Sequence, residues 1–374
     1  MNLGSASVRL NPFKGCLGPQ GDPVPWSPYG RTLPERPVFT LDPLLHAGAY
    51  YVQDASAMYV GHVFRSLLPA GGGLRVLDLC AAPGGKTTDL AASLREACGN
   101  DFLLVSNEVM RQRAAVLCDN VALWGDPNVV VTSADPAAFA RMPGFFDIIV
   151  ADVPCSGEGM FRKNPRAREE WSPATVDLCV ARQRRILADV WPALRQGGIL
   201  IYSTCTFEER ENDGNLQWAA AELGGTLFPP VTGFEGVTQT ACGVRLDIGE
   251  RGEGQWVGAL QRSTPAPKGR PLPLEDLHPL RMGVPKGFRK GADLVPNPDY
   301  ALSMLFDKNE YPCVEADRAL ALSFLHRDAL VLPDAPLGYV VITYCGLPLG
   351  FVKNLGRRCN NLHPLGRRIM MDVK

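Results

Sequence analysis

The sequence predicts an α/β protein in which a doubly wound parallel sheet is followed by a smaller mixed α+β domain. Short β-branched or apolar runs alternate with helical stretches from Leu74 onward, and this alternation is typical of right-handed βαβ units. A Pro-rich segment at 263–275 predicts a linker, after which the chain becomes more basic. The length of 374 residues is enough for two or three domains of roughly 100 to 200 residues each.

The periodicity of the apolar residues predicts the individual elements. Parallel strands are expected at residues 75–80, 102–107, 128–132, 146–151 and 199–203. Helices are expected between and after them, at 86–98, 111–124, 175–194 and 208–223. Strands at 243–248 and 255–260 flank a Gly-rich turn, which predicts an antiparallel hairpin that closes the sheet. A second hairpin is expected at 339–344 and 349–353, with Gly346 and Pro348 at its turn.

The N-terminal part has a different composition. Residues 18–37 are so rich in Pro and Gly that no regular element is expected there, so residues 1–37 should form an extended arm and loops. We therefore expect an N-terminal arm at 1–70, a sheet domain at 71–262, a linker at 263–275 and a C-terminal domain at 276–374.

The overall composition excludes several classes of protein. Hydrophobic residues at 46% and charged residues at 21% argue against a disordered chain. No apolar run approaches the roughly 20 residues that a membrane helix needs, and no signal peptide is evident, so a soluble cytoplasmic protein is expected. Eleven cysteines without a Cys-x-x-Cys pair fit neither a disulfide framework nor a zinc ribbon, and no metal site is expected.

The distribution of charge along the chain is more informative about binding partners than the net charge of −1. Residues 71–265 carry 18 Lys and Arg against 24 Asp and Glu, whereas residues 266–374 carry 15 against 11. Clustered cations are a candidate footprint for a phosphate backbone, and an ordinary solvated face is the alternative. Two C-terminal stretches contain cations and no acid: Arg281, Lys286, Arg289 and Lys290, then Lys353, Arg357, Arg358, Arg367 and Arg368.

The strongest local signal is the segment 76–87, where a buried strand runs into a Gly84-Gly85 turn that opens a helix. Glycine lets a ligand approach the main chain, and a helix N-terminus offers free N–H groups to an anion. A nucleotide triphosphate loop is excluded because Cys80 occupies the position of its first glycine. Glu108 and Asp135 end the next two strands, where acids can accept hydrogen bonds from a ribose and an adenine. These features favour an adenosine-containing cofactor.

Two thiols and one carboxylate follow neighbouring strands: Asp152 with Cys155, and Cys205. A cysteine at a strand end is often only a packing residue, but both lie here in loops at the expected cofactor edge. Cys–His hydrolysis is excluded because all five histidines lie outside the sheet region. A thiolate that attacks C6 of a pyrimidine needs no histidine. It makes C5 nucleophilic toward an electrophilic methyl group, while an acid near N3 and the exocyclic amine offsets the ring charge.

These residues resemble the NOL/NOP/Sun family of RNA 5-cytosine methyltransferases, and most closely its bacterial RsmF-like small-subunit ribosomal RNA branch. The resemblance covers nearly the whole chain. It rests on Arg9-Leu10-Asn11-Pro12, residues 50–58 (YYVQDASAM), 80–87 (CAAPGGKT), 152–163 (DVPCSGEGMFRK), Trp171-Ser172-Pro173, 203–207 (STCTF) and 346–354 (GLPLGFVKN).

The resemblance implies a class I, Rossmann-like methyltransferase sheet and a C-terminal PUA-like α+β RNA-binding domain. It implies methylation of cytosine C5 in 16S rRNA by a monomer, on free RNA or on the small subunit. A tRNA substrate and a catalytically silent assembly factor are the alternatives. The implied catalytic residues are Cys205 as nucleophile, Cys155 as the release-assisting thiol, and Asp152 with Lys86 near the target base. S-adenosylmethionine would be bound by Cys80, Ala81, Ala82, Pro83, Gly84, Gly85, Lys86, Glu108, Asp135 and Asp152.

The chain also departs from the family pattern. Asp247-Ile248 and Gln255 stand where relatives commonly carry a Pro-His pair and a further His. We expect these changes to affect RNA docking or packing more than the chemistry.

Overall fold

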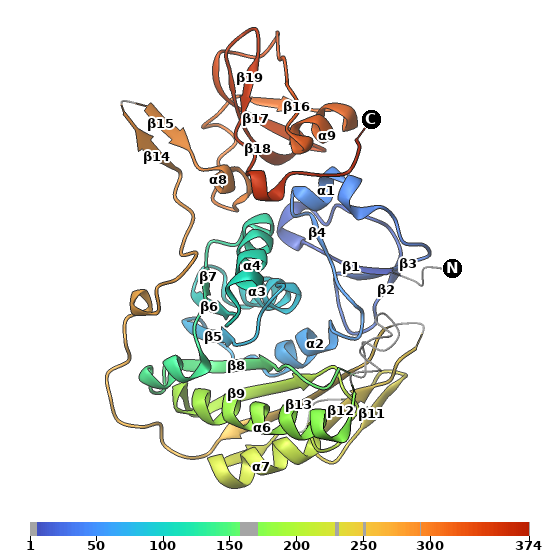
Figure 1. Cartoon of the computed structure of the whole chain (residues 1–374), viewed down its shortest axis with the longest axis vertical. Helices are drawn as coiled ribbons and strands as arrows, with labels where there is room; N and C mark the ends of the chain where they lie inside the picture. Colours follow the sequence, from blue (N-terminus) through green and yellow to red (C-terminus); the bar gives the residue numbers. More distant parts are fainter. Residues whose placement is uncertain (1–5, 158–170, 229–231, 250–251, 292, 374) are drawn as a thin grey trace.

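The computed structural model describes residues 6–157, 171–228, 232–249, 252–291 and 293–373. A large mixed sheet occupies the middle of the chain, an N-terminal sheet lies beside it, and a smaller C-terminal domain lies at one end of the long axis (Figure 1). The predicted α/β sheet followed by a smaller mixed domain is confirmed.

The large sheet has nine strands within the described residues. Its parallel strands lie in the order β7-β6-β5-β8-β9, and antiparallel β13 follows β9 and precedes β12 and β11. The strand order reverses between β5 and β8, which is where doubly wound sheets bind ligands at the carboxyl ends of their strands. The bounds are β5 (Leu74–Asp78), β6 (Phe102–Asn107), β7 (Val129–Thr132), β8 (Phe146–Asp152), β9 (Leu194–Thr204), β10 (Gly225–Leu227), β11 (Val237–Gln239), β12 (Gly243–Leu246) and β13 (Gln255–Arg262).

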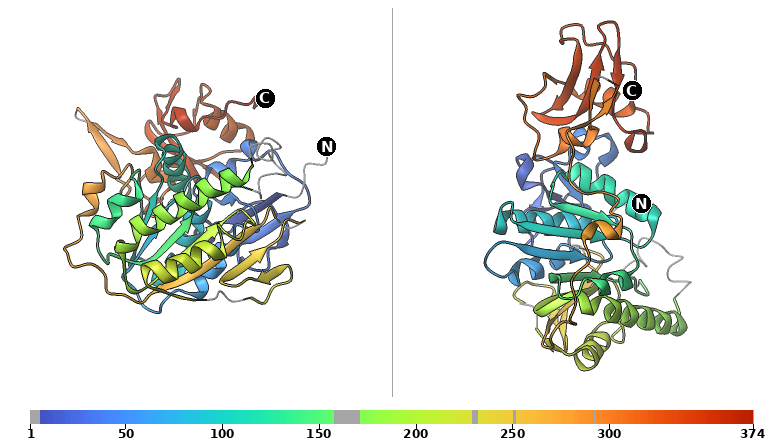
Figure 2. Two further views of the ribbon diagram at one scale, coloured as in Figure 1. Left: turned by 60° about the horizontal axis from the view of Figure 1, so that its bottom comes forward. Right: turned by 90° about the vertical axis from the view of Figure 1, so that its left-hand side faces the viewer.

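Helices cover both faces of this sheet, and each face has its own core. One core joins the sheet to α2 (Tyr59–Ser66), α3 (Gly85–Cys98) and α4 (Arg111–Trp124). The other core joins it to η3 (Pro136–Arg141), α6 (Pro173–Val190), η5 (Trp191–Ala193) and α7 (Asp213–Leu223), with α6 and α7 side by side on that face in Figure 2. The helix at 208–223 was predicted too long, because Glu211 and Asn212 lie in the loop before α7 and their side chains bond neighbouring loops.

The expectation that residues 1–37 form only an arm and loops is wrong. They contribute three strands to a four-stranded antiparallel sheet, ordered β2-β3-β1-β4, which we call the N-terminal sheet. Arg9 of β1 pairs with Gly30 and Tyr51 on the two neighbouring strands. The elements of this part are β1 (Ala6–Leu10), η1 (Pro12–Lys14), β2 (Asp22–Pro23), β3 (Gly30–Leu33), η2 (Phe39–Leu41), α1 (Pro43–His46) and β4 (Tyr50–Val52).

The C-terminal domain is built on a second four-stranded sheet, β16-β17-β18-β19, packed against α9. Its predicted central hairpin is confirmed. Cys345 and Gly346 form the turn with φ of 48° and 74°, values typical of a two-residue type I′ turn, whereas Pro348 lies within β18 and not in the turn. The elements are η6 (Leu274–Leu277), β14 (Gly287–Lys290), β15 (Asp293–Pro296), α8 (Pro298–Leu302), β16 (Cys313–Glu315), α9 (Arg318–His326), β17 (Gly338–Tyr344), β18 (Leu347–Asn354), β19 (Cys359–Asn361) and η7 (Leu365–Arg367).

An ion pair of Arg367, which is part of a small charged cluster, attaches the C-terminal domain to α4. Arg367 contacts both Asp119 of α4 and Asp299 of α8, and Asp299 also pairs with Arg281 of the segment before β14. Burial raises the pKa of Asp299, but Arg367 and Arg281 lower it to below its ordinary value. The carboxylate is therefore charged at neutral pH and joins the two arginines.

Candidate active site

The turn between β5 and α3 lies at the point where the strand order reverses. Gly84 has φ of 115°, a left-handed conformation that favours glycine, and no side chain caps α3. Four consecutive carbonyls of the turn accept side-chain hydrogen bonds. Arg113 donates to Ala82, Asn120 to Pro83, Thr88 to Gly84 or Gly85, and Arg9 to Gly85.

These contacts determine where the N–H groups of the turn point. In a trans peptide unit the N–H points opposite to the carbonyl, so the N–H groups of Gly84, Gly85 and Lys86 point away from the side chains that hold the carbonyls. Together with the positive end of the α3 dipole they form a site for an anion such as a carboxylate.

Three acids lie around this turn in different environments. Asp78 ends β5 and is fully buried; burial raises its pKa to about 7, although the hydrogen bond from Thr87 and the charge of Lys86 act in the opposite direction. Glu108 follows β6, is also buried, and pairs with Arg113 at 3.2 Å. Asp135 follows β7, is exposed, accepts from the Ala137 N–H and lies 3.5 Å from Arg185.

Asp152, at the end of β8, receives several donors. Lys86 Nζ lies 2.8 Å from Asp152 Oδ2, whereas Ser203 Oγ and Gln255 Nε2 donate to Oδ1 at 2.7 and 3.2 Å. Burial lowers the pKa of Lys86, but Asp152 raises it to above its ordinary value, so the ammonium is charged. Gln255 is buried and also donates to the Thr204 carbonyl. Gln255 was expected to affect RNA docking or packing more than the chemistry, but its side chain contacts Asp152, a candidate catalytic residue.

The two cysteines predicted to be chemical are in contact, with Cys155 Sγ and Cys205 Sγ 3.2 Å apart. The hydrogen bond from Cys155 lowers the pKa of Cys205 below its ordinary value, and nearby Lys86 adds to this effect against burial and Asp152. The same hydrogen bond, burial and the charge of Glu211 all raise the pKa of Cys155. Cys205 is thus the sulfur that ionises more readily, and Cys155 is the thiol that donates to it.

Side chains from the loop before α7 and from α6 hold the Cys155 loop in place. Glu211 is fully buried and accepts from the Ser156 N–H at 3.1 Å and from Gln183 Nε2 at 2.7 Å. Gln183 also donates to the Pro154 carbonyl, on the other side of Cys155. Neither Glu211 nor Gln183 was predicted from the sequence. The one available signal was a Glu-Asn pair seven residues after Thr204, which does not identify its partners.

The remaining thiol of the predicted site is Cys80, whose pKa is raised by burial and by Asp152, Asp78 and Glu108. Its sulfur is therefore a neutral neighbour of the site. The predicted motif 152–163 is described only as far as Gly157, and its residues 158–163 lie outside the described residues.

The cations of the basic C-terminal stretches are paired or exposed, apart from Arg368, which is half-buried. Lys286 pairs with Glu310, Lys353 with Asp293, and Arg281 and Arg367 with Asp299. Acids distant in the sequence therefore compensate much of the charge that appeared unopposed. Arg289, Lys290, Arg357 and Arg358 are exposed.

The described residues were also compared with the requirements of a metal site and of a membrane-spanning helix. Among them no group of three or more His, Cys, Asp and Glu side chains could hold a metal ion. No helix in the same part of the chain is long and apolar enough to cross a membrane.

Two family models match this chain. Residues 66–222 match the model described as 16S rRNA methyltransferase RsmB/F, and residues 311–369 match the methyltransferase RsmF PUA domain. The first match spans the turn after β5 and both cysteine loops, and the second spans the sheet of the C-terminal domain.

Curated and solved proteins agree with these matches. Ribosomal RNA small subunit methyltransferase F of Pectobacterium atrosepticum is 34% identical over 292 residues, which are 73% of this chain and 57% of that protein. The chain spans about half the length of the curated relatives it matches.

Two solved structures from Pyrococcus horikoshii share the fold. A methyltransferase homologue is 26% identical with a TM-score of 0.56, covering 69% of this chain and 86% of its own. NSun6, solved with SFG, is 24% identical with a TM-score of 0.53. The match covers 63% of this chain and 58% of NSun6. The sheet is therefore a methyltransferase sheet, and the C-terminal unit is a PUA domain. This chain belongs to the RsmB/F methyltransferase family, in its RsmF-like branch.

Proposed function

We propose that this chain is an S-adenosylmethionine-dependent methyltransferase that makes 5-methylcytosine in 16S ribosomal RNA. The observation that carries the proposal is the contact between Cys155 and Cys205 beside the Lys86–Asp152 pair, at the same sheet edge as the Cys80–Lys86 turn. A thiolate can attack C6 of a pyrimidine, a carboxylate can accept from its exocyclic amine, and a neighbouring thiol can donate to the sulfur as it leaves.

The residues present fit S-adenosylmethionine. The N–H groups of Gly84, Gly85 and Lys86 suit a carboxylate, and Glu108 lies at the end of β6, where a ribose is bound in sheets of this kind. Asp78 Oδ1 is buried with no hydrogen-bond partner among the described residues, which leaves an acceptor for an ammonium group. Asp135, at the end of β7, is proposed to contact the adenine. When bound, S-adenosylmethionine supplies the electrophilic methyl group.

The cysteines take different roles in this proposal. The Cys205 thiolate attacks C6 of the cytosine, which makes C5 nucleophilic. Asp152 accepts from the exocyclic amine and so orients the base, while the Lys86 ammonium offsets the negative charge that develops on the ring. After C5 has been methylated, its proton passes to solvent water, the C5–C6 double bond forms again and Cys205 leaves as a thiolate. The Cys155 thiol, 3.2 Å away, donates to the departing sulfur and assists release.

The PUA domain, proposed to span 276–374 after a linker at 263–275, would bring RNA to the catalytic domain at 71–262. The exposed pair Arg357 and Arg358 offers it a cationic contact. We propose that the enzyme acts as a monomer in the cytoplasm.

Methylation assays with three substrates test this function: free 16S rRNA, isolated small subunits and tRNA, each with tritium-labelled S-adenosylmethionine and bisulfite sequencing of the product. The proposal expects C5 methylation of 16S rRNA in one of its two forms. Methylation of tRNA alone would replace the substrate, and binding of RNA without methyl transfer would indicate a silent assembly factor. Calorimetry with S-adenosylmethionine and ATP tests the cofactor, since tight competing ATP binding would contradict the assignment.

A further inference from the structure

Arg9 is a charged residue whose burial the chemistry above does not explain. It lies on β1, in the Arg9-Leu10-Asn11-Pro12 segment, and both Arg9 and Asn11 are 0% exposed. Neither side chain can reach an RNA phosphate. Asn11 instead donates to the carbonyls of Gly48 and Trp124. The segment therefore serves the protein interior.

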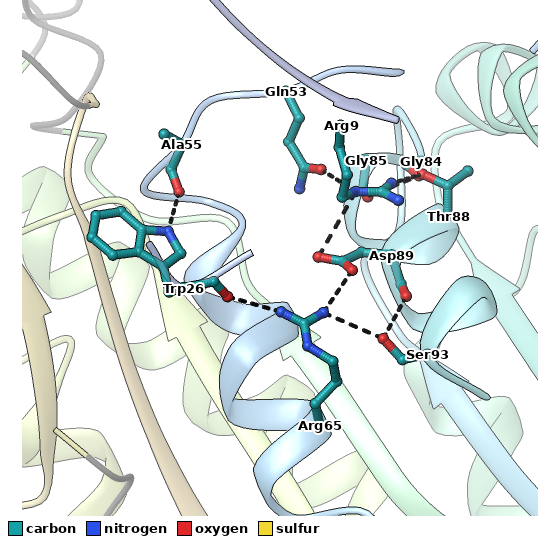
Figure 3. Close-up of polar contacts among 10 residues, drawn as sticks. All are labelled: Arg9, Trp26, Gln53, Ala55, Arg65, Gly84, Gly85, Thr88, Asp89 and Ser93. Carbon is teal, nitrogen blue, oxygen red and sulfur yellow. Dashed lines mark hydrogen bonds and ion pairs between the residues drawn. The ribbon is translucent and has the colours of Figure 1, made fainter. Parts of the chain in front are cut away.

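The Arg9 guanidinium bridges the N-terminal sheet and the first turn of α3 (Figure 3). Its Nη2 donates to the Gly85 carbonyl at 3.1 Å and to Thr88 Oγ1 at 2.5 Å. Its Nε donates to Gln53 Oε1 at 2.9 Å, one residue after β4. The guanidinium carbon, Cζ, lies 4.6 Å from the centre of the Trp124 ring. One side chain thus joins β1, the loop after β4, α3 and α4.

A shared carboxylate compensates the buried charge. Asp89 of α3 lies 3.8 Å from Arg9 and 2.9 Å from Arg65 of α2, and it is only 5% exposed. Arg65 also donates to Ser93 and to the Trp26 carbonyl. Both arginines therefore bind the same acid, but among the contacts of the described residues only those of Arg9 extend to the turn itself.

Close packing makes the position of the turn depend on the N-terminal sheet. A Cβ atom added to Gly85 would lie 3.2 Å from Tyr51 Cε1 and 3.5 Å from Gln53 Cδ. Gly85 and Lys86 carry two of the N–H groups that point away from the hydrogen-bonded carbonyls of the turn. A change of a few tenths of an ångström in the first turn of α3 would therefore displace the donors that meet the cofactor.

We propose that Arg9 is a positioning residue for the cofactor: through the Gly85 carbonyl and Thr88 it fixes the first turn of α3 in the geometry that binds S-adenosylmethionine. The inference rests on the proposed function for the identity of the cofactor. It assigns the N-terminal sheet a role in the cofactor site.

The test compares matched variants of the full chain. Arg9→Met removes the donor to the turn, whereas Arg65→Met removes the other partner of Asp89 and leaves the turn contacts intact. We expect Arg9→Met to raise the calorimetric Kd for S-adenosylmethionine at least tenfold. Arg65→Met should lower the melting temperature with a Kd within twofold of wild type. In turnover assays the KM for S-adenosylmethionine should rise with that Kd, while kcat at saturation and the KM for RNA change little.

A second pair keeps the test decisive if Arg9→Met does not fold. Thr88→Val removes the hydroxyl that accepts from Arg9 and bonds the turn carbonyls, and Thr88→Ser retains it. Thr88→Val should weaken S-adenosylmethionine binding several-fold, and Thr88→Ser should restore it. Wild-type binding by folded Arg9→Met, or by Thr88→Val where Arg9→Met does not fold, would overturn the inference alone. A wild-type chain that bound no S-adenosylmethionine would overturn the proposed function and the inference with it.

Discussion

At the residue scale, hydrogen-bond and charged partners determine how each functional group of this site behaves. Cys155 and Cys205 are the same residue type at the ends of adjacent strands, yet the hydrogen bond between them lowers the pKa of Cys205 and raises the pKa of Cys155. The charge of Lys86 adds to the first shift and the charge of Glu211 adds to the second. An opposite charge favours the ionised form of a group and a like charge disfavours it. The two thiols therefore differ because of their neighbours.

Removing Lys86 should make Cys205 less reactive. Lys86 favours the Cys205 thiolate, so Lys86→Met should raise the pKa of Cys205 and move its iodoacetamide-labelling profile to higher pH. At a fixed pH below that pKa, the labelling rate should fall about tenfold for each pH unit by which the profile moves. Mass spectrometry of the Cys205 peptide between pH 6 and 10 measures the labelling rate, with the exposed Cys313 as internal reference. An unchanged profile for Cys205 would mean that Lys86 does not activate this sulfur.

Gln255 is expected to contribute to catalysis through Asp152. Gln255→Leu keeps the approximate volume but removes the hydrogen bonds to Asp152 and to the Thr204 carbonyl. A hydrogen bond to a charged group contributes about 1.5 to 3 kcal/mol, so kcat should fall roughly ten- to a hundredfold. The KM for S-adenosylmethionine should change little.

Gln261→Leu is the matched control, because Gln261 lies on the same strand and donates to the exposed Gly197 carbonyl. If both variants kept the wild-type kcat, Gln255 would be only a packing residue.

At the scale of single elements, the core of the PUA domain includes a histidine that is neutral when folded. His363 follows β19, is 4% exposed and packs against Phe324 of α9. Burial lowers its pKa from 6.5 to about 4, although its hydrogen bond to the Arg367 carbonyl acts in the opposite direction.

This lowered pKa predicts a pH-dependent stability of the PUA domain. Between pH 6.5 and about 4 the unfolded chain binds a proton that the folded domain does not, so stability falls as the pH falls through this window. The loss should reach about 3 kcal/mol below pH 4, since a tenfold difference in proton affinity corresponds to about 1.4 kcal/mol. Hydrogen exchange of β17 and β18 measures the stability at pH 7.5 and pH 5.

His363→Gln keeps an amide donor without a titrating ring and should remove most of the loss, whereas exposed His278→Gln should not. An equal loss in wild type and His363→Gln would show that other groups cause it.

The sequence predicted those elements whose pattern is local. The parallel strands are short apolar runs buried on both faces, and the turn after β5 has its own glycines, so both were predicted correctly. The N-terminal sheet was missed because β1 pairs with β3 and β4, tens of residues away, across a Pro-rich segment. The contact of Gln255 with Asp152 joins residues 103 positions apart, and nothing local in the sequence indicates such a contact.

At the scale of the whole molecule, some C-terminal cations form ion pairs within the protein and others are exposed on its surface. Arg367 pairs with Asp119 of α4 and with Asp299 of α8, whereas Arg357 and Arg358 lie exposed between β18 and β19. The same stretch of sequence therefore contains cations that pair with acids of the protein and cations that are exposed. The C-terminal domain that carries them lies at the top of Figure 1.

Arg357→Gln/Arg358→Gln should weaken RNA binding and its dependence on salt. Each lost phosphate contact lowers the slope of log K against log salt by about 0.7 to 0.9, so the double variant should lower it by about 1.4 to 1.8. Filter binding from 50 to 300 mM salt measures it. Lys268→Gln/Arg270→Gln in the linker removes the same charge and is the control. If both double variants changed the slope equally, Arg357 and Arg358 would not form a specific contact.

Cys205 is proposed as the nucleophile and Cys155 as the thiol that assists its release. This assignment is tested most directly by incubating Cys155→Ala and Cys205→Ala with 16S rRNA or small subunits and S-adenosylmethionine, followed by denaturing gels. Cys155→Ala should attack C6 and transfer the methyl group but release slowly, so a covalent protein–RNA band should accumulate. Cys205→Ala should give no band and no methylation. A band for Cys205→Ala and none for Cys155→Ala would contradict the claim and make Cys155 the nucleophile.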